Sequence, residues 1–470
     1  MLHDVRYAGR TLRRNKVFTA LAILVLALGM GASTAIFSLI DSVLFKPLAV
    51  KDPGRLVLFT DPGVGGVQIG TDSSAARVML TYAEFAALRE RMSSFSHVFA
   101  VDSQWRALNA RIDGGVPEEI RLRLVSGDYF GALGVPALTG RVFTPPDEQG
   151  AGSAPYAVIS YHFWHDRFGG SSNVLSRRLT IQGTVYNIIG VMPPQFLGES
   201  VGDTIDAWIP LVMQPQIRKG QYWLEDDPAK VERVEWLQVF GRLRDGATLR
   251  QAQAEADVVF RRIVAASFRR FASTQPRLLK QSLRLRPGAQ GASDMREPIE
   301  EPLYVLLGMV GVLLLTACSN VAGLTLAHAT ARQKEVAMRL AVGAGRAHLV
   351  RRFLAESLLV CVASAAAGAG VAALATEMLI RLASAPGDRI LLDLQPDLRV
   401  FAFVAGIAVL AVGVSGIAPA LLSTRANLNE VLKGATAAVA GGFGRARAGK
   451  TIVASQVALS TPLLVCAGWL

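Results

Sequence analysis

The stretch VFTALAILVLALGMGASTAIFSLI, which runs from Val17 to Ile40, carries no charged side chain. As a helix it would be about 36 Å long at 1.5 Å per residue, enough to cross a bilayer core of about 30 Å. Because lipid offers the backbone no hydrogen-bond partners, such a stretch is expected to be helical. It is also longer than the apolar region of a cleavable signal peptide, which is usually about 7–15 residues. We therefore predict a membrane-spanning first helix.

Similar apolar stretches crowd the end of the chain. Leu303–Ala327, Val400–Thr424 and Thr451–Leu470 carry no charged side chain, and Ser357–Thr376 is bracketed by two glutamates. Together with the first stretch they predict five membrane helices. The predicted transmembrane helices are residues 17–40, 303–327, 353–377, 400–424 and 451–470.

A charge-rich segment, residues 41–302, separates the first helix from the second. Its strands and helices do not alternate in a long series, which predicts an α+β domain. Capping-box patterns at Thr81 and Thr248 predict helices to about Met92 and Phe271. The size of the segment suits one large domain or two subdomains. The predicted fold is therefore an α-helical transmembrane protein with a large extracytoplasmic α+β domain inserted between transmembrane helices 1 and 2.

Local patterns predict further elements in the same segment. Ala157–Ser160 reads as a short strand, and the aromatic-rich stretch Tyr161–Phe168 reads as a helix. Leu179–Ile181 and Val185–Val191 read as the two strands of a hairpin that turns at Gln182 and Gly183.

The formal net charge of +12 is concentrated in three short segments, 1–16, 328–352 and 425–450, which carry +4, +5 and +4. Residues 41–302 carry only +1, with 30 basic and 29 acidic side chains. By the positive-inside rule the three basic segments are cytoplasmic, while 41–302 and 378–399 lie outside the membrane. Because the large segment is nearly neutral, the basic composition does not indicate nucleic-acid binding.

The stretch Gly444–Thr451, GRARAGKT, matches the phosphate-binding pattern G-x-x-x-x-G-K-[ST]. A phosphate loop needs a strand before it and a helix after it. Here a Gly/Ala-rich run precedes the pattern, and a predicted membrane helix follows it. We therefore read this stretch as part of a basic cytoplasmic linker and expect it to bind no nucleotide.

The sequence predicts no catalytic residue, no bound cofactor and no metal site. His162 and His165 lie three residues apart, but no third ligand is near them, and their aromatic neighbours favour a packing helix. No cysteine falls in the large segment, so neither a disulfide framework nor a thiolate zinc site is expected there. The three cysteines all lie within apolar stretches: Cys318, Cys361 and Cys466.

The predicted cytoplasmic segment 328–352 contains the stretch ARQKEVAMRLAVGAGR. Glu335 and Arg339 are four residues apart, so on a helix they share one face. Gly343 and Ala344 are small and would permit close approach of another surface. The residues alone leave two interpretations open: a basic amphipathic anchor on the membrane surface, or a short helix that docks in a groove of a partner.

The stretch Arg332–Arg346 resembles the coupling segment of MacB-type, FtsX-like ABC transporter permeases, in which a glutamate, an arginine and an A-V-G-A run recur. The large segment is also similar to the exported domain of that family, and the resemblance extends from residue 1 to about residue 435. Four stretches carry this similarity: Val125–Arg141, Val158–Gly170, Ile189–Pro194 and Trp236–Gly246.

The resemblance implies a permease of the bacterial cytoplasmic membrane that has no enzymatic activity of its own. A separate cytoplasmic ABC-type ATPase would bind Glu335, Arg339, Gly343 and Ala344, and its cycle would move the exported domain, driving export by mechanotransmission. Such a permease needs a second half, supplied by a homodimer or by a fused repeat. The alternative is a non-transport membrane protein, either an FtsX-like regulator of cell-wall hydrolysis or a sensor with an exported ligand-binding domain.

Permeases of this family usually have four membrane helices, whereas this sequence starts a fifth. A basic run followed by an apolar helix repeats the layout of the first residues, as in the duplicated orphan permeases described from acidobacteria. This resemblance implies that residues 451–470 begin a second permease half.

Overall fold

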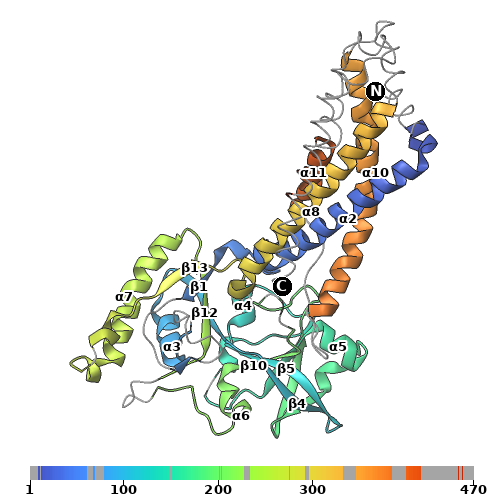
Figure 1. Ribbon diagram of the computed structural model, residues 1–470. Coiled ribbons are helices and arrows are strands. Elements are labelled where there is room, and N and C mark those ends of the chain that lie inside the picture. The colour runs from blue at the N-terminus through green and yellow to red at the C-terminus, as the bar shows by residue number, and fades with distance from the viewer. Residues whose placement is uncertain are drawn as a thin grey trace, which may run out of the picture. The chain divides into compact units, whose positions relative to one another are not determined.

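The computed structural model describes most of the chain, and all structural statements refer to the described residues. These are residues 9–10, 12–60, 67–68, 79–148, 150–200, 202, 204–226, 233–274, 276–291, 296–331, 346–383 and 398–413, with the single residues 454 and 458. They form two compact units (Figure 1). The main segment of the exported unit is Phe45–Met295, to which Arg389–Leu392 is also assigned, and the membrane unit comprises the helices before and after the main segment.

Three helices of the described chain are long and apolar enough to cross a membrane. They are α2 (Lys16–Ile40), α8 (Arg296–Ala331) and α10 (Arg346–Ala383). A shorter apolar helix, α11 (Leu398–Val412), covers the first half of the predicted fourth span. The second half of that span, and all of the predicted fifth span except residues 454 and 458, lie outside the described residues.

The helices of the membrane unit continue past the predicted limits of the spans. After Ile40 the chain makes a π-helical turn, η1 (Asp41–Phe45). Helix α8 already begins at Arg296, so the stretch before Leu303 is helical and includes Pro302 within the helix. The residues that directly flank the spans on this side, 41–45 and 296–302, are therefore helical rather than extended.

The exported unit is built on one mixed sheet with the strand order β10-β7-β9-β8-β4-β5-β3-β12-β1-β13. Strand β10 also pairs in parallel with β5, which closes β10, β7, β9, β8, β4 and β5 into a ring. The strands are β1 (Leu56–Thr60), β3 (Phe95–Asp102), β4 (Arg106–Ile112), β5 (Pro117–Val125), β7 (Tyr156–Ile159), β8 (Arg178–Ile181), β9 (Thr184–Val191), β10 (Ala207–Pro210), β12 (Leu237–Leu243) and β13 (Arg284–Pro287).

Short elements complete this unit. Strand β6 (Thr139–Gly140) pairs with β9, and β2 (Val67–Gln68) pairs in parallel with β11 (Val234–Glu235). The helices are α3 (Tyr82–Arg91), α4 (Tyr129–Leu133), α5 (Tyr161–Phe168), α6 (Gln214–Ile217) and α7 (Leu249–Ser267).

Local sequence signals account for several of these elements. Thr81 and Thr248 both cap their helices through reciprocal capping boxes, as predicted. Helix α7 ends at Ser267, four residues before the predicted Phe271, because a 3₁₀ turn follows it. The predicted hairpin is confirmed: Gln182 and Gly183 have φ values of 52° and 84°, the left-handed backbone that a tight two-residue turn requires.

The exported unit has a core on each face of the sheet. Successive residues of β1 alternate between the two, with Phe59 in the core under α3 and α7 and Leu56 in the core beside α4. Strand β5 belongs to both the closed ring and the rest of the sheet, so the two parts form one continuous sheet. Of the two predicted alternatives, the segment therefore forms one large domain rather than two separate subdomains.

Candidate functional site in the membrane unit

Helix α2 is the central helix of the membrane unit and contacts α8, α10 and α11 (Figure 1). Its apolar side chains join a cluster that includes Leu26 of α2, Cys318 of α8, Cys361 of α10 and Ile407 of α11. Any movement of α2 must therefore be accommodated by three neighbouring helices.

Small residues bring α2 and α10 into close backbone contact. A Cβ atom placed on Gly31 would lie 2.7 Å from the Cβ of Val371 and 2.8 Å from the carbonyl oxygen of Gly368. A Cβ on Gly368 would in turn lie 3.2 Å from the carbonyl oxygen of Ala27. Lipid gives helices no hydrophobic reason to associate, so close packing through small residues is a main source of their association.

The helix directions place the two helix ends that flank the predicted coupling segment on one side of the bundle. Helix α8 runs antiparallel to α2, since Gly29 lies against Ala317 while Ile40 clusters with Leu303. Helix α10 runs parallel to α2. The last residues of α8 and the first of α10 thus lie toward the beginning of α2.

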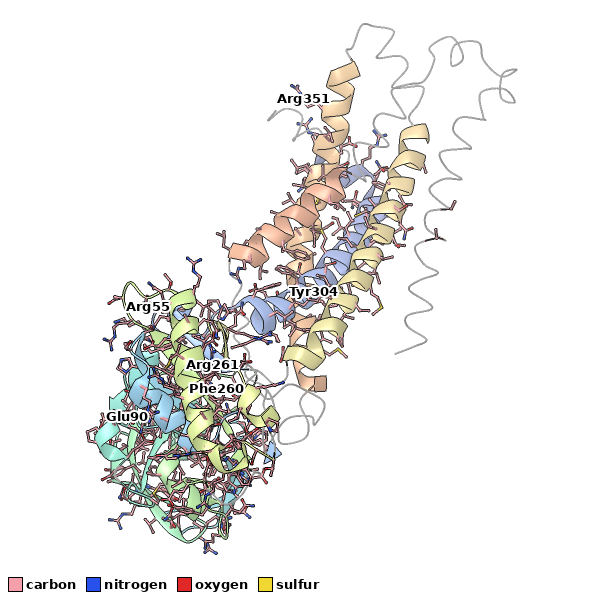
Figure 2. All side chains as sticks on the ribbon, turned by 90° about the vertical axis from the view of Figure 1, so that its left-hand side faces the viewer. Arg55, Glu90, Phe260, Arg261, Tyr304 and Arg351 are labelled. Carbon is pink, nitrogen blue, oxygen red and sulfur yellow. The ribbon has the colours of Figure 1, made fainter. Side chains whose placement is uncertain are left out.

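Figure 2 shows this arrangement from another side: Tyr304 near the start of α8 and Arg351 near the start of α10 lie toward opposite ends of the membrane unit. The predicted cytoplasmic segments 1–16 and 328–352 therefore adjoin the same side of the bundle, as alternating crossings require.

The four predicted partner-binding residues, Glu335, Arg339, Gly343 and Ala344, lie outside the described residues. The structure describes the helices on either side of these residues: α8 ends at Ala331 and α10 begins at Arg346. The roles assigned to these four residues remain predictions.

At the other end of α2, a charged pair links this helix to α11. Oδ1 of Asp41 lies 3.7 Å from Nη1 of Arg399. One turn further into the bundle, the rings of Phe37 and Phe403 stack with centroids 3.9 Å apart. This contact is not predictable from the sequence alone. Its only signal was that opposite charges directly flank two apolar stretches on the same predicted side of the membrane.

Two pairs of oppositely charged side chains are buried in the exported unit. Glu199 accepts hydrogen bonds from Arg123 and from the hydroxyl of Tyr129, and all three side chains are buried. Removing one partner would leave a buried charge uncompensated, so these contacts are expected to fix the loop around residue 199 against the sheet.

A second buried pair joins Asp102 and Arg218, whose side-chain atoms are 2.6 Å apart. Burial raises the pKa of the Asp102 carboxyl, and the neighbouring Arg218 opposes that shift. The guanidinium of Arg218 also lies 4.2 Å from the ring centroid of Trp223. Both of its charged and aromatic contacts are thus internal to the unit, which indicates a structural role.

The histidines of α5 make local contacts. The ring of His162 packs edge-on against Tyr161, and His165 lies 3.6 Å from Asp166. Among the described residues, no group of three histidine, cysteine, aspartate or glutamate side chains could hold a metal ion. The cysteines Cys318 and Cys361 are buried and free, and both lie in the membrane unit.

Comparison with protein families gives two matches that follow the same division of the chain. The family model of the MacB-like periplasmic core domain matches residues 19–259, and that of the FtsX-like permease C-terminal domain matches residues 307–428. The chain belongs to the MacB-type, FtsX-like family of ABC permeases. It is a bacterial membrane protein whose large extracytoplasmic α+β domain is inserted between its first two membrane helices.

Curated relatives of this permease are macrolide export ATP-binding/permease proteins named MacB. The relative from Salmonella paratyphi A is 24% identical over 366 residues, covering 75% of this chain and 49% of the relative. The one from Rhodospirillum rubrum is 26% identical over 378 residues, covering 78% and 51%. The one from Escherichia coli K12 is 22% identical over 370 residues, covering 77% and 50%. The chain spans about half the length of the curated relatives it matches.

Among solved structures, the permease is similar to the periplasmic region of MacB from Actinobacillus actinomycetemcomitans, with a TM-score of 0.34 and 13% identity over 56% of this chain and 97% of that one. It is also similar to the extracellular domain of the noncanonic ABC-type transporter YknZ from Gram-positive bacteria. There the TM-score is 0.30, with 14% identity over 49% and 99%.

Proposed function

We propose that this chain is the permease subunit of an ABC transporter, in which a separate cytoplasmic ATPase drives movement of the exported domain. The proposed outcome is export by mechanotransmission across the bacterial cytoplasmic membrane. The N-terminus is cytoplasmic in this proposal, and the chain itself hydrolyses no ATP.

The observation that carries the proposal is the length and connectivity of α8. This single helix, Arg296–Ala331, has 36 residues and is therefore about 54 Å long at 1.5 Å per residue. It begins where the exported unit ends and stops at the residue before the predicted coupling segment. Pro302 lies in its first two turns and no other proline interrupts the helix beyond it, so a displacement at one end of this stretch is expected to reach the other.

The coupling segment is the proposed contact with the ATPase. Glu335 and Arg339 present a charged pair to a groove of the partner, and Gly343 and Ala344 let its surface approach closely. The proposal also requires a second permease half, supplied by another copy or by a fused repeat of the duplicated orphan type. The family match supports the assignment as an ABC permease. The positions of the last residue of α8 and the first residue of α10 support a contact with the ATPase at the segment between them.

Two substitutions in the coupling segment test this function. Glu335→Arg reverses a charge and Gly343→Trp adds bulk, and neither lies in a predicted membrane helix. We expect both variants to insert normally but to lose co-purification with the ATPase and stimulation of its ATP turnover. A charge reversal at the edge of an interface mainly slows association, whereas disrupting a buried pair costs several kcal/mol of binding free energy.

The matched control is Arg14→Glu, which reverses an exposed charge in the other basic segment next to α2. It should keep both binding and stimulation. If Glu335→Arg and Gly343→Trp both bind and stimulate the ATPase like the parent chain, the coupling role is wrong and the segment is a membrane-surface anchor.

A further inference from the structure

The outer end of α2 carries an acidic side chain that is buried in the membrane unit. Asp41 is only 3% exposed and is the first residue of the π-helical turn η1. Charged groups at membrane helices are costly to bury and are found paired, and they often mark functional positions. Asp41 forms an ion pair with Arg399, the second residue of α11, whose charged group lies 3.7 Å from the Asp41 carboxylate.

A second contact reinforces this pair. Phe37 precedes Asp41 by four residues, and Phe403 follows Arg399 by four residues, so both lie one helical turn further into the bundle. Their rings are nearly parallel, with an interplanar angle of 7°. The ion pair and the ring contact therefore join α2 to α11 at two points, one helical turn apart.

The position of Asp41 and Arg399 along the chain suggests a role for the pair. Asp41 lies four residues before the exported unit begins at Phe45. Helix α2 leads directly into the main segment of that unit, Phe45–Met295, and α8 leads directly out of it, whereas α11 adjoins neither end of that segment in the sequence. The pair thus connects a helix that leads directly into this segment with one that does not.

We propose that Asp41 and Arg399 form an ionic latch that holds α2 against α11 in the resting permease and opens when α2 moves. This inference rests on the proposed function. At 3.7 Å the two atoms are beyond hydrogen-bonding distance, so their attraction depends on charge and separation rather than on alignment. Such a contact can break and re-form as one helix slides past the other. Asp41 and Arg399 are positioning residues in this scheme.

The first test asks whether the pair exists and needs no ATPase. The unfolding midpoint of the purified full chain in detergent is measured for Asp41→Asn, for Arg399→Gln and for the exchanged double variant Asp41→Arg/Arg399→Asp. Each single variant should lower the midpoint, and the exchange should recover most of the loss. Arg14→Gln, which removes an exposed charge at the other end of α2, should leave it unchanged. An exchanged variant as unstable as the two single variants combined would overturn the latch.

The second test asks whether the latch must open. In a chain whose three native cysteines are replaced by alanine, Asp41→Cys/Arg399→Cys is joined by a short, reducible bis-methanethiosulfonate reagent. We expect the joined chain to stimulate the co-purified ATPase at least tenfold less than before joining, with recovery on reduction. A merely structural contact would not respond in this way, because holding it closed would change nothing.

The control joins α2 to α8, which both connect to the exported unit, through Ile40→Cys/Leu307→Cys in the same apolar cluster. This variant should keep most of its stimulation after joining. If the latch variant stimulates equally well joined and unjoined, the latch is wrong while the proposed function stands. If the unjoined chain does not stimulate the ATPase at all, the proposed function fails, and the charge exchange alone decides whether the pair exists.

Discussion

Gly31→Ala is expected to destabilise the membrane unit through the contact between α2 and α10. The added Cβ would lie 2.7 Å from the Cβ of Val371 and 2.8 Å from the carbonyl oxygen of Gly368. Neither atom is the free end of a flexible side chain, so the helices must move apart to admit it. Adding a methyl group to a well-packed core costs about 1–3 kcal/mol. That corresponds to roughly a 5- to 150-fold shift in the unfolding equilibrium.

The control for this prediction is Gly308→Ala on α8, where nothing lies within 4 Å of the new Cβ. Both substitutions replace a helical glycine by alanine, and the gain of about 1 kcal/mol in helix propensity is common to both. The difference between them therefore isolates the packing cost. Unfolding of the purified chain by titration of a denaturing detergent into mixed micelles measures it. Equal stability of the two variants would refute the close helix contact.

The remaining predictions concern topology, nucleotide binding and pH. An impermeant thiol reagent applied to intact spheroplasts should label Ser153→Cys but not Ala347→Cys, and the reverse pattern would invert the predicted topology. The purified chain should bind no ATP, and Lys450→Ala should change nothing; binding that this substitution abolishes would revive Gly444–Thr451 as a phosphate loop. Hydrogen bonds from Arg141 lower the pKa of Asp147, so this pair stabilises the exported unit above the unfolded aspartate pKa of about 3.9 and loses its contribution as the pH falls through the lower, folded value. Asp147→Asn should reduce this loss of unfolding free energy at acid pH, which amounts to about 1 kcal/mol or less for a partly exposed pair. A pH profile of thermal unfolding that the substitution leaves unchanged would refute the prediction.

Elements with a local chemical signal were predictable from the sequence. The helix starts at Thr81 and Thr248 depend on side chains three residues away, and the hairpin turn at Gln182 depends on two adjacent residues. The membrane helices were predictable because lipid imposes length and apolarity on every residue of a span.

The closure of the sheet was not predictable in this way. Strand β10, Ala207–Pro210, is four residues long and pairs in parallel with β5, in which Leu122 is the partner of Ala207. Such a pairing is set by packing between residues far apart in the chain, and no turn chemistry marks it. The sequence could therefore indicate an α+β domain without the ring that organises it.

The same distinction applies to the membrane unit. Glycines are frequent in α2, α8 and α10, yet Gly31 meets a neighbour at van der Waals distance or closer, while Gly370 has nothing within 4 Å of an added Cβ. Only the packed helices show which of them matter. The pair of Asp41 and Arg399 joins residues at opposite ends of the chain, and each charge alone looks like an ordinary boundary of an apolar stretch.

The central claim is that ATP turnover on the cytoplasmic side moves the exported unit. The most direct measurement attaches an environment-sensitive fluorophore to Ser153→Cys, an exposed position of the exported unit, in the otherwise cysteine-free chain. The labelled chain is reconstituted in nanodiscs with its ATPase, and the emission is recorded before and after addition of ATP. The account predicts an ATP-dependent change that Glu335→Arg abolishes. An ATPase that is bound and turning over, while the emission from the exported unit stays constant, would contradict it.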